Sequence, residues 1–176
     1  MDSLYFIAIL TPDPVTKKIR QVQEDFALNY KSDRQLKIPV HVTLIPPFKM
    51  KDRELNALSR GVRDCCKYHP PFELYLNGFG AFDKRVIYVD LLESRQLSNI
   101  QKDVQQQMMK FNLDVTNRQF KPHITVANRD LKKEQFDLAW QKYENTEFAG
   151  SFLVQAVVLL KHNGKQWDVF ESFDLS

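Results

Sequence analysis

Two short segments of this sequence are nearly alike and lie half a chain apart. "PVHVTLIPPF" covers residues 39–48 and "KPHITVANR" covers residues 121–129, so that His41 and His123 are 82 positions apart in a chain of 176 residues. In both segments a histidine and a threonine alternate with aliphatic residues, which is the period of a strand with one buried face. One strand repeated at matching places indicates an internal duplication, and this restricts the fold to two similar halves.

The rest of the chain predicts strands and helices in the same order around each motif. Apolar runs and alternation predict strands over 4–10, 40–48, 72–82, 85–93 and 123–129, with Pro46 and Pro47 ending the second of them, and a closing hairpin over 152–175 that turns at "HNGK". Helical spacing predicts helices over 14–30, 51–69, 94–112 and 131–145. The second block lacks an opening strand, and residues 113–120 are too short to supply one.

These elements predict an α+β fold. We expect a bilobal, duplicated arrangement of largely antiparallel sheets with outer helices, pseudo-twofold symmetry and an active-site cleft between the lobes. Residues 1–176 would form one bilobal domain with one His-x-Thr motif in each lobe. We also expect a monomer.

Composition narrows the class of protein. The net charge of +3 is compatible with a phosphate-bearing partner, but no block of five or six like charges indicates a nucleic-acid tail. Cys65 and Cys66 are adjacent on a predicted helix, where neighbouring side chains diverge and do not bridge easily. Reduced thiols predict a cytoplasmic protein. The apolar run over 4–10 is too short for a signal peptide or a membrane span.

The histidines and threonines define a candidate site for a phosphate. On each strand the two polar residues share one face, about 6.5–7 Å apart, so His41 with Thr43 and His123 with Thr125 can touch one tetrahedral anion. In-line attack at phosphorus needs a base for the incoming oxygen and an acid for the leaving oxygen on opposite sides. Histidine, with a reference pKa of about 6.5, suits both roles near neutral pH, and threonine hydroxyls can hold the non-bridging oxygens. This chemistry requires no metal and no cofactor.

Two other interpretations of the motifs stay open at this point. A single His-x-Thr tripeptide is a weak signal, because such residues also occur on ordinary strands. A metal site would need more ligands than His41 and His123, and no cysteine or carboxylate lies close in sequence to either of them. We therefore assign no metal-binding residues.

The paired motifs resemble those of the 2H phosphoesterase superfamily, and "HVTLIPPF" and "PHITVA" are most similar to its 2′-5′ RNA ligase-like branch. The resemblance implies metal-independent hydrolysis of cyclic phosphodiesters, often nucleoside 2′,3′-cyclic phosphates, with His41 and His123 catalytic and Thr43 and Thr125 binding phosphate. The partner would be an RNA end or a small nucleotide. Ligation or cleavage of 2′-5′ linkages, and a nucleotide- or RNA-binding module with little turnover, are the alternatives.

Two departures from the branch leave the substrate open. "IPPF" stands where Phe-Leu-Gly often follows the first motif, and Asn128 stands where an arginine often follows the second. Arg129 comes one residue later, an offset that on a regular strand directs it to the opposite face. Four residues remain candidates for substrate contact: Phe48 for base stacking, and Lys37, Lys121 and Arg129 for phosphates.

Overall fold

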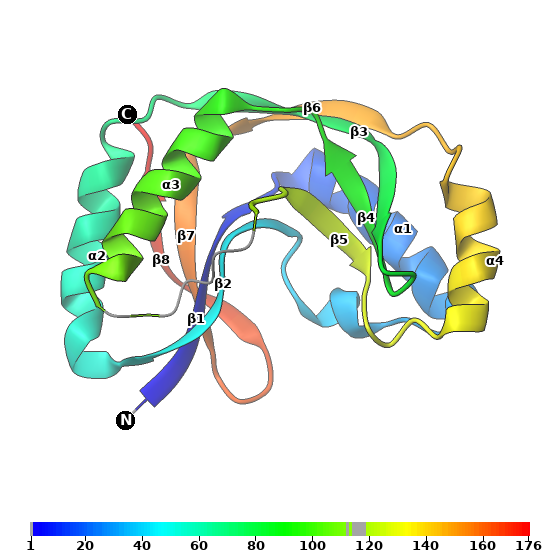
Figure 1. Ribbon diagram of the computed structural model, residues 1–176, viewed down its shortest axis with the longest axis horizontal. Helices are drawn as coiled ribbons and strands as arrows, with labels where there is room; N and C mark the ends of the chain where they lie inside the picture. Colours follow the sequence, from blue (N-terminus) through cyan, green and yellow to red (C-terminus); the bar gives the residue numbers. More distant parts are fainter. Residues whose placement is uncertain (1, 112, 114–118) are drawn as a thin grey trace.

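The computed structural model describes residues 2–111, 113 and 119–176, and it contains two four-stranded antiparallel sheets (Figure 1). The first sheet has the order β2–β1–β7–β8, formed by His41–Lys51, Asp2–Leu10, Ala156–His162 and Trp167–Asp174. The second has the order β5–β4–β3–β6, formed by His123–Ala127, Val86–Leu91, Phe72–Phe82 and Ala149–Val154. The predicted α+β class with antiparallel sheets is confirmed.

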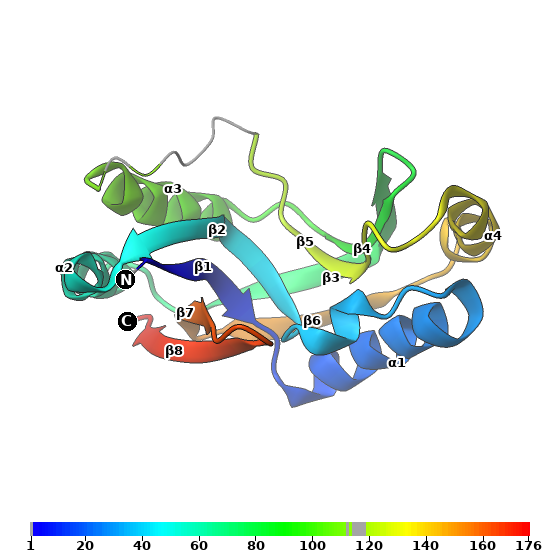
Figure 2. The same ribbon diagram turned by 90° about the horizontal axis from the view of Figure 1, so that it is seen from below.

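Four helices cover the sheets, at the places that the helical spacing predicts. They are α1 (Asp13–Tyr30), α2 (Asp52–Cys66), α3 (Arg95–Met109) and α4 (Lys133–Tyr143), with a short 3₁₀ helix η1 at Arg34–Lys37. Helices α2 and α3 pack together against the first sheet, whereas α1 packs against the second sheet and α4 against α1 (Figures 1 and 2). Among the described residues, no helix combines the length and apolar character needed to cross a membrane.

One unit of the fold occurs in both halves of the chain. The unit β1-α1-β2 matches β4-α3-β5, and each motif strand takes the edge position beside the strand that opens its own half. The missing opening strand of the second half is therefore β4, which the sequence pattern had assigned to the hairpin of the first block. The turn between β3 and β4 joins the two halves directly, so no linker marks the boundary. The segment 113–120 lies mostly outside the described residues.

Two predicted strand ends are wrong. Strand β2 continues through Pro46 and Pro47, because its register with β1 shifts there and both prolines fall in a bulge opposite Phe6. A proline in an edge-strand bulge removes no ladder hydrogen bond. The predicted closing hairpin is confirmed for β7 and β8, but residues 152–154 belong to β6 in the other sheet, and Gln155 alone separates β6 from β7.

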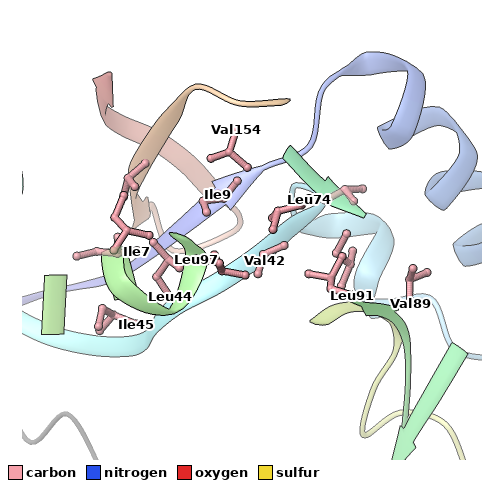
Figure 3. Packing of buried hydrophobic residues seen from close by; sticks show 14 of the residues in the cluster. Ile7, Ile9, Val42, Leu44, Ile45, Leu74, Val89, Leu91, Leu97 and Val154 are labelled. Carbon is pink, nitrogen blue, oxygen red and sulfur yellow. The ribbon is translucent and has the colours of Figure 1, made fainter. Parts of the chain in front are cut away.

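One hydrophobic core joins both sheets and fixes the motif strands. Figure 3 shows Val42 and Leu44 of β2 among buried side chains of β1, β3, β4, β6 and α3. Ile124 and Val126 of β5 belong to the same buried cluster and are fully shielded from solvent. Because these aliphatic residues face the core, the alternating residues of both strands face away from it, as the period of two predicts.

Candidate active site

The structure places the two motif strands next to each other. Strands β2 and β5 are the outer strands of their sheets, and their backbones adjoin (Figure 2). His41 and His123 each begin their strand, and both side chains are half-buried. The imidazoles are close enough for the charge of His123 to lower the pKa of His41. Two histidines from opposite halves of the sequence thus share one electrostatic environment.

Both imidazoles are held by the same backbone contact. Nδ1 of His41 lies 2.6 Å from the carbonyl oxygen of Pro39, and Nδ1 of His123 lies 2.7 Å from that of Lys121. A carbonyl can only accept a hydrogen bond, so Nδ1 carries the proton and donates it in each ring. Nε2 is then the titrating atom of both histidines, and the chain presents it in one fixed ring orientation.

An aromatic ring from the neighbouring strand packs against each imidazole. The Phe6 ring of β1 lies 5.0 Å from that of His41, at an interplanar angle of 52°. The Tyr88 ring of β4 lies 5.0 Å from that of His123, at 53°. Tyr88 lies over Gly80 of β3, where any β-carbon would overlap its ring. The near-identical geometry shows that the duplication extends to the support of the site.

Burial lowers the pKa of both histidines, and the charges around them differ. For His41 burial is the largest effect, and the positive charges of His123 and Arg20 lower its pKa further. For His123 burial is again the largest effect, and the charge of Lys121 adds to it, but Asp90 acts in the opposite direction. Both rings therefore reach the neutral form at a lower pH than an ordinary histidine.

Thr43 and Thr125 accompany the histidines on the same faces of their strands. Each is half-buried, and each pairs in register with the strand that supports the neighbouring imidazole: Thr43 opposite Ala8 and Thr125 opposite Tyr88. Within the described part of the chain, no buried side-chain oxygen lacks a hydrogen-bond partner. Each hydroxyl belongs to a half-buried side chain two residues from the imidazole of its own strand.

Of the four further candidates, the structure brings Lys121 to the motif histidines. Its ammonium group lies 5.1 Å from the ring centroid of Phe82 and 5.6 Å from that of Tyr88, and both rings touch His123. Phe48 packs on Tyr5, and the core covers it in part. Lys37 pairs with Asp33 on the surface of η1, and Arg129 lines a separate hollow. Substrate contacts of these residues stay predictions.

A chain of aromatic rings leads from His41 to the β7–β8 hairpin. The Trp167 ring meets Phe6 edge-on at 4.6 Å, and the His162 ring lies 5.0 Å from that of Trp167. Trp167 and His162 are far from the first motif in the sequence, and only the pairing of β1 with β7 and of β7 with β8 brings them near it. His69 lies elsewhere, with Nε2 2.8 Å from the Asp103 carboxylate.

Helix α1 braces the two motifs through a pair of polar side chains that sequence analysis missed. Arg20 donates to Gln23 Oε1 and to the carbonyls of Gln35 and Ile38, just before the first motif. Gln23 Nε2 donates to the carbonyl of Thr125 in the second motif. Gln23 is 2% exposed. A glutamine inside the apolar stripe of this helix was the available signal.

Replacing Gln23 with leucine is expected to lower kcat about tenfold, because the change leaves the Thr125 carbonyl unpaired and frees one motif strand from the other. Loss of one partner from a buried hydrogen bond costs about 1–3 kcal/mol of stability. Gln21→Leu, on the exposed side of the same helix, is the matched control. Urea unfolding and steady-state kinetics measure both effects, and equal kcat values for the two variants would contradict the bracing role.

Comparison with known proteins places the chain in a family. A family model described as the 2′-5′ RNA ligase superfamily matches residues 11–166, which include both motifs. The chain belongs to the 2′-5′ RNA ligase superfamily. The expected resemblance to 2H phosphoesterases is confirmed at this level. A search of curated protein sequences finds no match.

Several solved structures share the fold over nearly the whole chain. Escherichia coli LigT complexed with 3′-AMP superposes with a TM-score of 0.75 at 19% identity, covering 100% of this chain and 99% of LigT. TT0787 of Thermus thermophilus gives a TM-score of 0.73 at 19% identity, covering 98% of this chain and 97% of TT0787. At this level of identity the likeness establishes the fold.

Proposed function

We propose that this protein is a phosphodiesterase that hydrolyses 2′,3′-cyclic phosphate ends of nucleotides or RNA by general acid–base catalysis. The matched presentation of His41 and His123, each fixed by a hydrogen bond from Nδ1 so that Nε2 is the titrating atom, carries this proposal. Hydrolysis at phosphorus needs one proton removed and one supplied. A module that only binds nucleotides has no need for two such groups.

In the proposed reaction a water oxygen attacks phosphorus, and the bond from phosphorus to one ribose oxygen breaks. Nε2 of the base takes the proton of the attacking water, and Nε2 of the acid gives its proton to the leaving ribose oxygen. Thr43 and Thr125 donate hydrogen bonds to the non-bridging oxygens, where negative charge gathers in the transition state. The histidines exchange roles over one turnover, and proton exchange with solvent restores them.

The charges around the histidines favour His41 as the base. Two positive charges, those of Arg20 and His123, lower the pKa of His41, and this favours its neutral form. Around His123 the two charges oppose each other: the charge of Lys121 lowers its pKa, and the Asp90 carboxylate raises it and so favours the protonated form that an acid needs. Both charges near His41 favour the neutral form that a base needs, whereas one of the two charges near His123 favours the protonated form.

The ligands in the related structures support a substrate with a nucleotide portion. LigT structures are described in complex with 3′-AMP, ATP and NADP⁺, and another in complex with phosphate. Phosphate is the group that the four motif side chains are suited to hold. Nucleotide binding by a superfamily member is consistent with a phosphodiester of a nucleotide as the substrate here.

The proposal is tested by incubating the protein with the four nucleoside 2′,3′-cyclic phosphates and with an oligoribonucleotide that ends in one, with and without EDTA. We expect a single phosphate monoester from each substrate that turns over, at a rate that EDTA leaves unchanged. A 2′-5′-linked dinucleotide in the same panel examines the ligase-type alternative suggested by the superfamily. Binding of a nucleoside monophosphate without turnover of any cyclic substrate would contradict the proposal.

A further inference from the structure

A hollow of about 500 Å³ lies where the β3–β4 turn meets the segment between β5 and α4. Lys84 and Arg85 come from the turn, Arg129 follows β5, and Lys133 is the first residue of α4. These four exposed side chains are defined here as the basic cluster. Asp83 and Leu131 complete the lining. A concave surface with four cations and one carboxylate is suited to an anion.

The lining of the hollow carries a net charge of +3, equal to the net charge of the whole sequence. The sequence has 25 Lys and Arg against 22 Asp and Glu; without the four cations and Asp83, 21 of each sign are left. Within the described residues, none of the four cations forms an ion pair with a carboxylate. The positive end of α4 lies at Lys133 and adds to the same potential.

The turn geometry holds two of these cations at the edge of the site. Asp83 and Lys84 both have positive φ, 47° and 51°, within the three-residue connection between Phe82 of β3 and Val86 of β4. The residue before this turn is Phe82, whose ring lies 5.0 Å from that of His123. The Phe82 ring thus reaches the second motif histidine, while the turn itself lies toward the Ala127 end of β5, because β4 pairs with β5 from Ile87 opposite Ala127 to Asp90 opposite His123.

The other two cations lie further along the second motif strand. His123 and Ala127 are the ends of β5, about 13 Å apart at 3.3 Å per residue. Arg129 and Lys133 follow beyond Ala127. A nucleotide whose phosphate lies between the histidines does not reach that far, whereas a longer strand continues along β5 toward the basic cluster.

We propose that the basic cluster binds backbone phosphates of an RNA strand whose cyclic end lies between His41 and His123. The inference rests on the proposed function and narrows the substrate from free nucleotides to RNA ends. It gives Arg129 a phosphate partner upstream of the scissile bond. Binding through phosphates carries no base specificity, and it weakens as salt concentration rises.

The test compares Lys84→Gln/Lys133→Gln with Lys102→Gln/Lys110→Gln, a double variant that removes two exposed lysines on and next to α3. Two probes are used: a nucleoside 2′,3′-cyclic phosphate and an oligoribonucleotide that ends in the same group. The first variant should lower kcat/KM for the oligonucleotide about tenfold. The slope of log(kcat/KM) for the oligonucleotide against the logarithm of the salt concentration should become about 1.4 less steep, at about 0.7 for each lost phosphate contact. The mononucleotide rate should stay unchanged.

Anisotropy with a labelled oligoribonucleotide that ends in a 3′-phosphate measures binding independently of turnover. If the oligonucleotide binds more weakly to the cluster variant but not to the control variant, the basic cluster is supported even when no cyclic substrate is hydrolysed. In that case only the proposed function fails. Equal affinities and equal salt slopes for the two double variants would overturn the basic cluster. An equal loss on the mononucleotide would overturn it as well, because the change would then act on the histidines.

Discussion

His41→Ala and His123→Ala are each expected to lower kcat/KM for a 2′,3′-cyclic substrate by about 10²–10⁴-fold, because each change removes one proton transfer from the reaction. Hydrolysis still needs the other transfer, so one remaining histidine does not compensate. Combining the two changes should cost much less than the product of the single losses, as is usual for residues that act as a unit. Steady-state kinetics of the two single variants and the double variant measure this.

His69→Ala is the matched control, since it removes an imidazole that pairs with Asp103 away from the motifs. We expect it to lower stability and to leave kcat close to that of the unchanged protein. Each motif alanine variant should keep the thermal unfolding midpoint within a few degrees, because the imidazoles are half-buried. Full activity in either motif variant would contradict the acid–base assignment.

Thr43→Val and Thr125→Val are each expected to lower kcat about a hundredfold, because each removes one hydrogen-bond donor from the charge that develops on the phosphate. Valine keeps the β-branched shape that suits the strand, so the loss reports on the hydroxyl. The affinity for the uncharged part of the substrate should change little. Separate values of kcat and KM for a cyclic nucleotide give the measurement.

Thr43→Ser and Thr125→Ser are the matched controls, because serine keeps the hydroxyl and loses the methyl group. Both serine variants should recover most of the activity that the valine variants lose. If valine and serine cost the same, the threonines contribute through packing, and the hydroxyls have no role in binding phosphate.

The site was predictable from sequence where it depends on local pattern. The alternation in "HVTL" and "HITV" decides which residues face the core, and burial of Val42, Leu44, Ile124 and Val126 enforces that direction. The half-chain spacing of the two motifs indicates an internal duplication, and a duplicated fold brings the two motif strands together. Those two observations were sufficient to name the histidines and threonines before any contact was known.

The support of the site depends on pairing between distant strands, and no local pattern encodes it. Phe6 and Tyr88 reach the imidazoles only through the registers of β1 with β2 and of β4 with β5. The two strand errors have the same origin. A register shift at Pro46 and a change of sheet after β6 are long-range events, and the short apolar runs around them are compatible with several pairings.

The pH dependence of kcat/KM tests the central claim most directly, in the unchanged protein and in both alanine variants. The base must be neutral and the acid protonated, so the rate falls below the lower and above the higher macroscopic pKa of the pair. Since both pKa values are lowered, we expect a bell with its maximum below about pH 6.5, the reference value for histidine. The residual activity of His41→Ala should lose the acidic limb, and that of His123→Ala the alkaline limb. A bell that persists unchanged in either variant would contradict catalysis by the histidine pair.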